Sequence, residues 1–305
     1  MRENHLSLPA VDIVTVTYNS LRHLATYAEA LGAVAYPPSR LRVFLVDNAS
    51  GDGTLDRLRS LGSQFPLPVT VIARSRNGGF GAACNEGAAG GEAPFILFLN
   101  PDARPAPEML AVLAGRATED PRIGLIDAAQ EPVEIPKWRD EGTDYTDWCS
   151  GAALLARRAA FDQLGGFDPF FFLYAEDVDL SWRMWLAGWS CVYETRGRVW
   201  HAAPTPDQEP RAIESHYAVR YSFAMRLIYD SARGFATHLL RGGRYLGSPR
   251  THPSTRRAVA LGMTDLCLAL PHLLRRRFAA QRLLRTSLAR ERVVFAEWYY
   301  GRWRS

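Results

Sequence analysis

The sequence has few cysteines and lacks the long apolar runs of membrane-spanning proteins. Its four cysteines, Cys84, Cys149, Cys191 and Cys267, lie far apart and form no CxxC pair. This spacing argues against a zinc knuckle or a dense disulfide framework, and it fits a reducing compartment. No apolar run reaches the about 20 residues that span a bilayer, and the N-terminal segment has no apolar core of signal-peptide length. We therefore expect a cytoplasmic protein.

Low-complexity tracts and internal repeats are also absent. The 305 residues are 47% hydrophobic and 22% charged, which is typical of a folded chain with a substantial core. The formal net charge of +4 is unevenly distributed, because eleven arginines face only three acidic residues from Ser254 to Ser305. A basic C-terminal part on a mildly acidic body indicates contact with an anionic surface.

Short apolar runs alternate with helical patterns in the first half of the chain. Strands are predicted at residues 11–18, 41–47, 69–73 and 95–99, and helices at 21–31, 54–61, 107–116 and from Phe80. Continuous aliphatic strands between helices predict a mostly parallel α/β sheet with helices on both faces. Such sheets bind ligands at the carboxyl ends of their strands.

Polar residues follow all four of these strands. The stretches are Tyr18-Asn19, Asp47-Asn48, Arg76-Asn77 and Asn100-Pro101-Asp102. A turn alone explains Asn or Asp at any single strand end, but four such ends together favour a ligand site. Glycines at positions 78, 79 and 81 ahead of a helix let the backbone approach a phosphate. Their spacing is not GxGxxG, so a nicotinamide site is disfavoured.

The second half of the chain contains another α/β segment. Residues 127–147 carry seven acidic side chains against Lys137 and Arg139, and are predicted to form a mobile loop. A strand and a helix follow, then an acidic turn into a helix ending at Gly188, and two further strands up to His201. Beyond Pro210 the pattern is helical and increasingly basic.

The stretch LYAEDVDLSWR concentrates carboxylates at a predicted helix start. Asp179 and Arg183 are spaced to pair on the helix surface, which accounts for Asp179 structurally. Glu176 and Asp177 follow an aromatic run, and mutual repulsion and burial both raise a carboxyl pKa, as a catalytic base requires. A lone histidine such as His201 is more often structural, although near Asp102 it becomes a candidate metal ligand.

Taken in order, these motifs resemble the family-2 glycosyltransferases of GT-A fold, which transfer a sugar from a nucleotide-sugar with inversion. The matching stretches are VTVTYN at 14–19, VDNASGDGT at 46–54, RNGGFGAACNEG at 76–87, LNPDA at 99–103, SGAALLARR at 150–158 and GGFDPFFFLYAEDVDLSWR at 165–183. The resemblance covers about two-thirds of the chain, residues 11–201. The NPDA variant is most similar to bacterial rhamnosyltransferases of cell-surface polysaccharide assembly.

The resemblance implies a role for each matching residue. Asp177 would be the general base, with Glu176 positioning it. Acceptor binding would fall to Trp148, Ser150 and Gly151, with Trp148 as a sugar-stacking ring. The donor-binding residues would be Thr17, Tyr18, Asn19, Asp47, Asn77, Gly79, Asn100 and Asp102.

A divalent metal is the cofactor that the resemblance implies. In this family the fourth strand ends in a DxD-type motif that holds the ion against the donor pyrophosphate. Only Asp102 is retained here, since Asn100 stands at the first acidic position. His201 would supply a further contact to Mg²⁺ or Mn²⁺, which prefer hard ligands.

The resemblance also implies a domain organisation and partners. Residues 1–205 would form the GT-A catalytic domain, with nucleotide-sugar binding at 11–126 and the acceptor part at 148–201; residues 206–305 would form a basic helical region. The donor would be a dTDP- or UDP-sugar, and the acceptor a glycan or a polyprenyl-linked glycan. For the basic tail, peripheral contact with the inner face of the plasma membrane is favoured. Packing on the catalytic domain and a homo-oligomer contact stay open.

Two other functions compete with glycosyl transfer. The weakened metal motif suits a carbohydrate- or nucleotide-sugar-binding pseudoenzyme, but retention of Asp102 and the Glu176-Asp177 pair argues against it. A sugar-phosphate nucleotidyltransferase would carry a glycine-rich basic loop after the first strand, and VTVTYNSLRH has no such glycines. No motif that reads nucleic acid accompanies the basic tail, so no nucleic-acid partner is expected.

Overall fold

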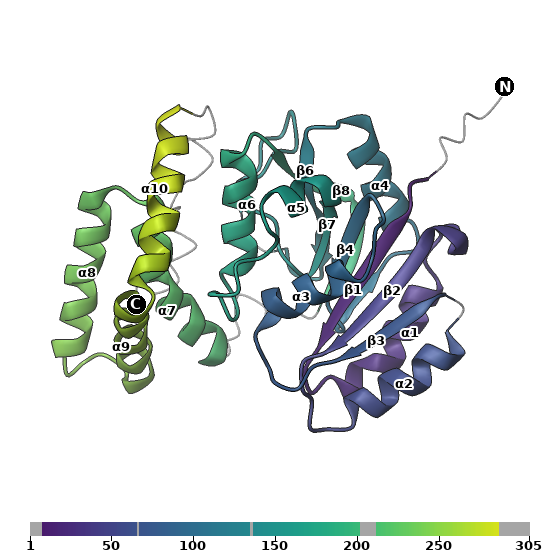
Figure 1. Ribbon diagram of the computed structural model, residues 1–305, viewed down its shortest axis with the longest axis horizontal. Coiled ribbons are helices and arrows are strands. Elements are labelled where there is room, and N and C mark those ends of the chain that lie inside the picture. Colours follow the sequence, from purple (N-terminus) through teal and green to yellow (C-terminus); the bar gives the residue numbers. More distant parts are fainter. Residues whose placement is uncertain (1–7, 66, 135–136, 202–211, 287–305) are drawn as a thin grey trace.

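The computed structural model describes residues 8–65, 67–134, 137–201 and 212–286. Figure 1 shows a sheet flanked by helices on one side of the molecule and a group of C-terminal helices on the other. The sheet has eight strands in the order β3-β2-β1-β4-β7-β6-β8-β5. The predicted α/β fold with a helical extension is confirmed. The expected boundary near residue 205 lies outside the described residues.

Four parallel strands form one half of the sheet. They are β1 (Val11–Thr17), β2 (Leu41–Asp47), β3 (Val69–Ala73) and β4 (Phe95–Leu99). Every residue of β1 and β4 is buried, as expected where helices cover both faces. Because the strands are parallel, their carboxyl ends meet at one edge of the sheet.

The other half of the sheet mixes parallel and antiparallel pairs. Its strands are β5 (Ala103–Pro105), β6 (Ile123–Glu131), β7 (Ala153–Arg157) and β8 (Ser190–His201). β7 runs antiparallel to β4 and β6, β8 runs parallel to β6, and β5 runs antiparallel to β8. The last pairing sets Ala103 opposite His201, next to the polar end of β4.

Two predictions for this half were wrong. β8 is one strand rather than two, because it pairs with β6 on both sides of an irregularity between Glu194 and Arg198. The stretch predicted as a loop from Asp127 starts inside β6, which extends to Glu131. Asp127 is fully buried there by partners distant in sequence, which the local charge pattern does not reveal.

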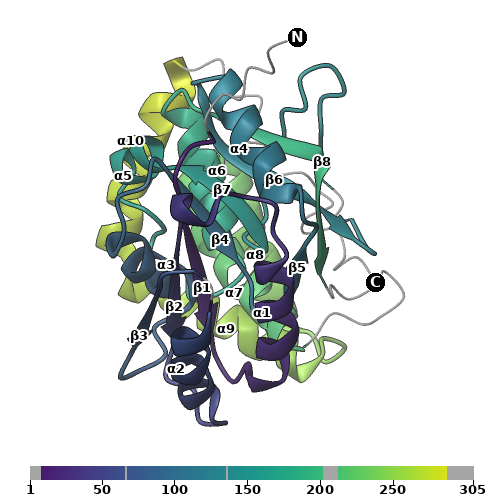
Figure 2. The same cartoon turned by 90° about the vertical axis from the view of Figure 1, so that its right-hand side faces the viewer.

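Helices cover both faces of the sheet, as Figure 2 shows from the side. One apolar cluster joins Val11 and Ile13 to the helices α1 (Leu24–Gly32), α2 (Thr54–Gln64) and α4 (Met109–Glu119). A second cluster joins Val14 and Val16 to α3 (Phe80–Ala89), α5 (Arg158–Gln163) and α6 (Glu176–Leu186). Two short 3-10 turns, Leu21–His23 and Pro38–Arg40, precede α1 and β2.

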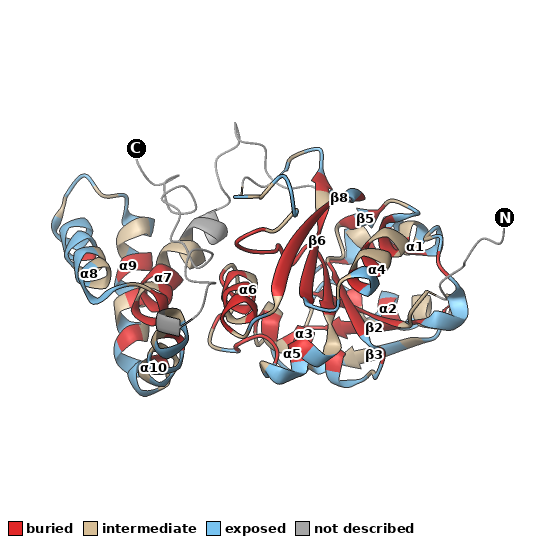
Figure 3. Ribbon diagram, turned by 90° about the horizontal axis from the view of Figure 1, so that it is seen from above, coloured by how far each residue is buried: buried red, intermediate tan, exposed pale blue. Residues whose placement is uncertain are grey.

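Four helices follow the sheet. They are α7 (Ala212–Tyr229), α8 (Ala232–Gly247), α9 (Pro253–Leu268) and α10 (Leu270–Thr286). These helices contact α6 through α7 and α10. A third apolar cluster joins Val178 and Trp182 of α6 to Phe223 of α7 and Leu273 of α10. Figure 3 shows α7 mostly buried and α8 mostly exposed. The C-terminal helices therefore support the helix that begins with Glu176-Asp177.

Candidate active site

The carboxyl ends of β1 and β2 lie side by side at the edge of the sheet. Thr17 is opposite Asp47 in the strand register, and its hydroxyl donates a 3.3 Å hydrogen bond to the Oδ1 of Asp47. The Oδ2 of Asp47 accepts the backbone N–H of Ser50 at 3.0 Å. Both strand-end side chains are buried, so these contacts fix the orientation of the carboxylate.

Tyr18 and Asn19 form the turn that leaves β1. Tyr18 is 52% exposed, which leaves its ring accessible to a ligand at this edge. Asn19 has a φ of +51°, in the left-handed region that asparagine tolerates better than most residues. Its N–H donates to the Oγ of Ser50, and its side-chain oxygen accepts the N–H of Gly51, both at 2.9 Å. Asn19 thus joins the turns after β1 and β2.

Two asparagines hold the glycine turn ahead of α3. The Nδ2 of Asn48 donates to the Oδ1 of Asn77 at 2.8 Å, and the same oxygen accepts the N–H of Gly79 at 3.0 Å. Gly79 has a φ of +91°, and a Cβ there would lie 2.6 Å from the carbonyl oxygen of Phe172. That carbonyl also accepts the N–H of Phe80 at 2.9 Å. The start of α3 therefore lies against the segment that leads into α6.

Asp102 and His201 come together because β5 pairs with the end of β8. The Oδ1 of Asp102 lies 3.5 Å from the Nε2 of His201. Burial raises the pKa of Asp102, but the hydrogen bond and positive charge of His201 outweigh burial and lower it overall. The other ring nitrogen of His201 lies 3.0 Å from the Oε1 of Gln130, which orients the imidazole.

This pair offers one carboxylate and one imidazole to a cation. Asn100 precedes it at the end of β4 and donates its backbone N–H to the carbonyl of Ala152 at 2.9 Å. Within the described residues, no group of three or more His, Cys, Asp or Glu side chains is placed to hold a metal ion. The two side chains fit a divalent ion that takes its remaining ligands from phosphate oxygens and water.

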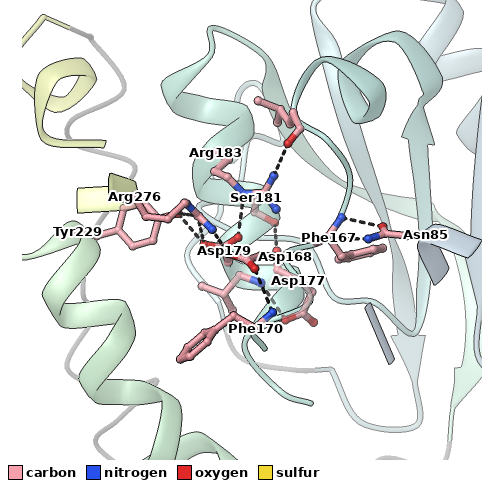
Figure 4. A network of polar contacts seen from close by, with 12 residues as sticks. Asn85, Phe167, Asp168, Phe170, Asp177, Asp179, Ser181, Arg183, Tyr229 and Arg276 are labelled. Carbon is pink, nitrogen blue, oxygen red and sulfur yellow. Dashed lines mark hydrogen bonds and ion pairs between the residues drawn. The ribbon is translucent and has the colours of Figure 1, made fainter. Parts of the chain in front are cut away.

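The two carboxylates at the start of α6 have different environments (Figure 4 labels Asp177). Glu176 is buried, its Oε2 accepts the N–H of Ala175 at 3.0 Å, and burial followed by the charge of Asp177 raises its pKa to about 8. Asp177 is partly exposed, and its Oδ2 accepts the N–H of Gly151 at 3.0 Å. Burial also raises the pKa of Asp177. Asp177 is thus the accessible member of the pair.

Asp179 is engaged in a structural network, shown in Figure 4. Its Oδ2 accepts from Arg183 at 2.8 Å, and its Oδ1 accepts from Tyr229 at 2.7 Å and from Arg276 at 2.6 Å. Arg276 also pairs with Asp168, which lies before α6. The predicted Asp179–Arg183 pair is confirmed. The network also joins α6 to α7 and α10.

The predicted acceptor residues form a continuous segment ahead of β7. The N–H of Ser150 donates to the Oδ2 of Asp127 at 2.8 Å, and that of Gly151 donates to Asp177. Trp148 is 6% exposed and shares the apolar cluster with Val178 of α6. Its ring therefore forms part of the interior behind this segment and offers little surface for the sugar stacking that the resemblance implied.

Several residues of the site were given no role from the sequence. Asn48 and Gln130 orient predicted residues, and Asp127 holds Ser150, but each acts across strands that are distant in sequence. Tyr221 of α7 accepts the N–H of Phe172 at 2.9 Å, and the ring of Phe172 stacks on another ring of α7. The aromatic spacing of α7 was the available signal for this contact.

The profile described as "Glycosyl transferase family 2" matches residues 12–180, which is more than half of the chain. The chain belongs to this family. Its members are inverting enzymes of GT-A fold, and the matched residues contain the edge of β1–β4, Asp102 and the Glu176-Asp177 pair. The predicted recognition and the predicted enzyme class are therefore confirmed.

Two relatives with similar sequences are named as rhamnosyltransferases. The N-acetylglucosaminyl-diphospho-decaprenol L-rhamnosyltransferase of Mycobacterium tuberculosis is 30% identical over 259 residues, which cover 69% of this chain and 82% of that protein. The rhamnosyltransferase WbbL of Escherichia coli K12 is 42% identical over 105 residues, 34% of this chain and 40% of that protein.

Solved structures agree on the fold. The mannosyltransferase PcManGT from Pyrobaculum calidifontis, in complex with GDP-Man and Mn²⁺, matches with a TM-score of 0.60 and 21% identity, covering 90% of this chain and 85% of that one. TarS 1-349 of S. aureus, in complex with UDP-GlcNAc, matches with a TM-score of 0.58 and 18% identity, covering 90% of both chains. At these identities the likeness concerns the fold alone.

Proposed function

We propose that the protein transfers a deoxysugar, rhamnose first among them, from a nucleoside-diphosphate donor to a hydroxyl of a lipid-linked glycan by single displacement. The observation that carries the proposal is the position of Asp177, a partly exposed carboxylate at the start of α6 whose pKa is raised by burial. A raised pKa brings a carboxylate closer to the basicity needed to take a hydroxyl proton. The two rhamnosyltransferase relatives support the choice of sugar.

The donor is proposed to bind along the edge formed by β1 to β4. Thr17, Tyr18 and Asp47 would contact the nucleoside, because Tyr18 is exposed beside the fixed carboxylate of Asp47. Asn77 and Gly79 would face the sugar-phosphate at the start of α3, where a helix N-terminus favours an anion. A dTDP-sugar is the first candidate, and a UDP-sugar the second.

A divalent ion, Mg²⁺ or Mn²⁺, is proposed to lie at Asp102 and His201, beside Asn100. When bound, such an ion neutralises negative charge on the departing diphosphate. The chain itself orients the imidazole through Gln130 and keeps Asp102 ionised through His201. The PcManGT complex, which contains Mn²⁺ together with GDP-Man, supports a metal-dependent donor site in this fold.

The acceptor is proposed to approach the backbone of Ser150 and Gly151, next to Asp177. Gly151 leaves room for it, since a Cβ there would already lie 3.2 Å from the ring of Phe80. Trp148 would support this segment from behind, because its ring is buried. The decaprenyl-linked acceptor named for the mycobacterial relative supports a lipid-linked glycan as the substrate.

The C-terminal helices are proposed to meet an anionic membrane surface at its cytoplasmic side. Among the described residues, no single helix is long and apolar enough to cross a bilayer. The pair α9 and α10, which is bent by 81°, is long and apolar enough only when both helices are counted together. Leu240, Leu268 and Phe278 are each at least 70% exposed on three different helices. Exposed apolar side chains among arginines favour an interfacial position.

The test is transfer of rhamnose from dTDP-rhamnose to a polyprenyl-diphosphate-linked N-acetylglucosamine, with the product identified by mass spectrometry. A product heavier by one deoxyhexose is expected with the wild type, and its rate of formation should be lower by about 100-fold or more with Asp177→Asn. UDP-glucose and UDP-N-acetylglucosamine serve as competing donors. Transfer from one of these in place of dTDP-rhamnose would show that rhamnose is not the transferred sugar. No transfer to any lipid-linked acceptor would show that the acceptor is not a lipid-linked glycan.

Membrane contact is tested separately by sedimentation with vesicles. Binding to vesicles that contain phosphatidylglycerol, and not to pure phosphatidylcholine, is expected. Leu268→Asp combined with Phe278→Asp should reduce it, because both changes add charge to exposed apolar positions. Equal binding by this double variant would reject these helices as the contact surface.

A further inference from the structure

Lys137 is the only lysine in a chain with 36 lysine and arginine residues together. Its side chain is 4% exposed and pairs with the fully buried carboxylate of Asp127. The ammonium nitrogen lies 4.6 Å from the ring centroid of Tyr193 and 5.0 Å from that of Trp148. A compact ammonium suits this aromatic-walled position, whereas the planar fork of arginine is wider.

This ion pair is connected to the candidate base through two consecutive peptide groups. Besides pairing with Lys137, the Oδ2 of Asp127 accepts the N–H of Ser150 at 2.8 Å. The next N–H along the chain, from Gly151, donates to the Oδ2 of Asp177 at 3.0 Å. Movement of this short segment would therefore move the hydrogen-bond donor of Asp177.

The same segment also reaches the donor edge. The carbonyl of Ala152, one residue further on, accepts the N–H of Asn100 at 2.9 Å. Three consecutive residues thus join the buried ion pair, the candidate base and the end of β4. A misplacement of about 1 Å between reacting groups lowers a rate by roughly 100-fold, so the stability of this junction matters for catalysis.

We propose that the Lys137–Asp127 ion pair is a positioning pair for Asp177. It fixes the backbone at Ser150 and Gly151 and sets the charge around the base. A buried ion pair adds little to stability compared with an apolar pair of similar size, so a positioning role accounts better for its presence. The inference rests on the proposed function, in which Asp177 takes the acceptor proton.

The charges around Asp177 predict the direction in which its pKa changes when the ion pair is altered. Burial raises the pKa of Asp177 and the N–H groups of Gly151 and Val178 lower it, while the charge of Asp127 raises it and that of Lys137 lowers it. The charged groups that face it are Glu176 on its own helix, Asp127 on β6 and Lys137 in the loop after β6. Asp127→Asn removes a negative charge and leaves the lysine, so the pKa of Asp177 should fall.

The first experiment reads this pKa directly. Protein labelled with [¹³C]aspartate at the carboxyl carbon is titrated by NMR, and the signal of Asp177 is assigned by its loss in Asp177→Asn. We expect a lower pKa of Asp177 in Asp127→Asn. The acid limb of the plot of kcat against pH should move to lower pH as well. An unchanged pKa overturns the proposal. The NMR titration does not depend on activity, so it separates this outcome from failure of the proposed function.

The second experiment tests whether the pair acts as a unit. Lys137→Met, Asp127→Asn and the double variant are compared in transfer assays. Each single change should lower kcat by about 10- to 100-fold with the donor KM unchanged. The kcat of the double variant should be no lower than that of the less active single variant. The double variant leaves no buried charge unpaired, which keeps the test valid if a single variant folds poorly. Independent, multiplying losses would contradict the proposal.

A matched control comes from a second buried ion pair at the opposite end of β1. Arg158 contacts the fully buried Asp12 at 2.8 Å, far along the strand from Thr17 and the site. Arg158→Met should lower the melting temperature without changing kcat or the acid limb of its pH dependence. If this control lowers kcat and moves the limb as Asp127→Asn does, the effects come from lost stability and the positioning role is rejected.

Discussion

The backbone N–H of Gly151 donates a 3.0 Å hydrogen bond to the Oδ2 of Asp177. This contact joins the segment before β7 to the start of α6, two regions that the local sequence does not connect. It leaves Asp177 partly exposed between two buried carboxylates, Glu176 and Asp179. Three acidic side chains within four residues of one helix therefore have different chemical behaviour, which mutation and titration can separate.

Replacing the candidate base should separate activity from stability. Asp177→Asn should lower kcat by about 10²- to 10⁴-fold, the usual contribution of a general base. The melting temperature should not fall, because burial raises the pKa of Asp177 and so disfavours its ionised form in the folded protein. Donor binding, followed by thermal shift, should be unchanged. A variant that keeps most of its kcat would exclude Asp177 as the base.

Stability should decrease as pH rises through the titration of Glu176. Its folded-state pKa of about 8 exceeds the ordinary value of 4.5, because of burial and then the charge of Asp177. Its contribution to stability is therefore complete below the unfolded pKa and lost as pH rises to the folded pKa. We expect the free energy of unfolding to fall by about 2–4 kcal/mol across this window.

The matched variant for that measurement is Glu176→Gln, which cannot titrate. Urea unfolding at several pH values should give a flatter pH dependence for Glu176→Gln than for the wild type. The remaining slope reports the other buried carboxyl groups, Asp127, Asp147 and Asp177, whose pKa values are raised in the same direction. Parallel curves for the two proteins would contradict a raised pKa at Glu176.

The close approach of Gly79 to Phe172 should make Gly79→Ala costly. Gly165 is the control, since it also has a positive φ, +72°, but a Cβ there meets nothing within 4 Å. Gly165→Ala should cost about 1 kcal/mol through its backbone conformation alone. Gly79→Ala should cost more and also weaken donor binding, as measured by denaturation and thermal shift. Equal costs would show that the Phe172 carbonyl does not constrain Gly79.

The C-terminal helices should stabilise α6 through Arg276. Arg276→Ala leaves Asp168 and Asp179 without one of their cationic partners, and should cost about 3 kcal/mol of unfolding free energy. Arg275→Ala, at the exposed neighbouring position, should cost less than about 0.5 kcal/mol. Similar losses for both variants, measured by urea unfolding, would mean that the network does not hold α10 to α6.

The sequence predicted the first half of the fold well because its signals are local. Aliphatic strands separated by amphipathic helices define β1 to β4 residue by residue, with the ends of β2, β3 and β4 as expected. The second half was harder, because the aliphatic start of β6 gives way to the polar stretch DAAQE at 127–131. The burial of Asp127 depends on Lys137 and on Ser150, partners that fold next to it only in the complete sheet.

In the candidate site, too, local motifs identified some residues, whereas others depend on contacts between distant parts of the chain. The strand-end residues and the Glu176-Asp177 pair were predictable, since motif order and resemblance identify them. Their orienting partners were not, because Gln130 reaches His201 and Gly151 reaches Asp177 only through the mixed pairing of β6, β7 and β8. The support that α10 gives to α6 likewise comes from a helix beyond the family motifs.

The most direct test of the central claim is release of nucleoside diphosphate from a panel of nucleotide-sugars, with and without Mg²⁺ or Mn²⁺. Wild type is compared with Asp177→Asn and Asp102→Ala. Metal-stimulated release from one donor, a dTDP-deoxysugar, is expected in the wild type and should be lost in both variants. Release that persists unchanged in Asp177→Asn, in the presence of acceptor, would contradict the role of Asp177 as the base.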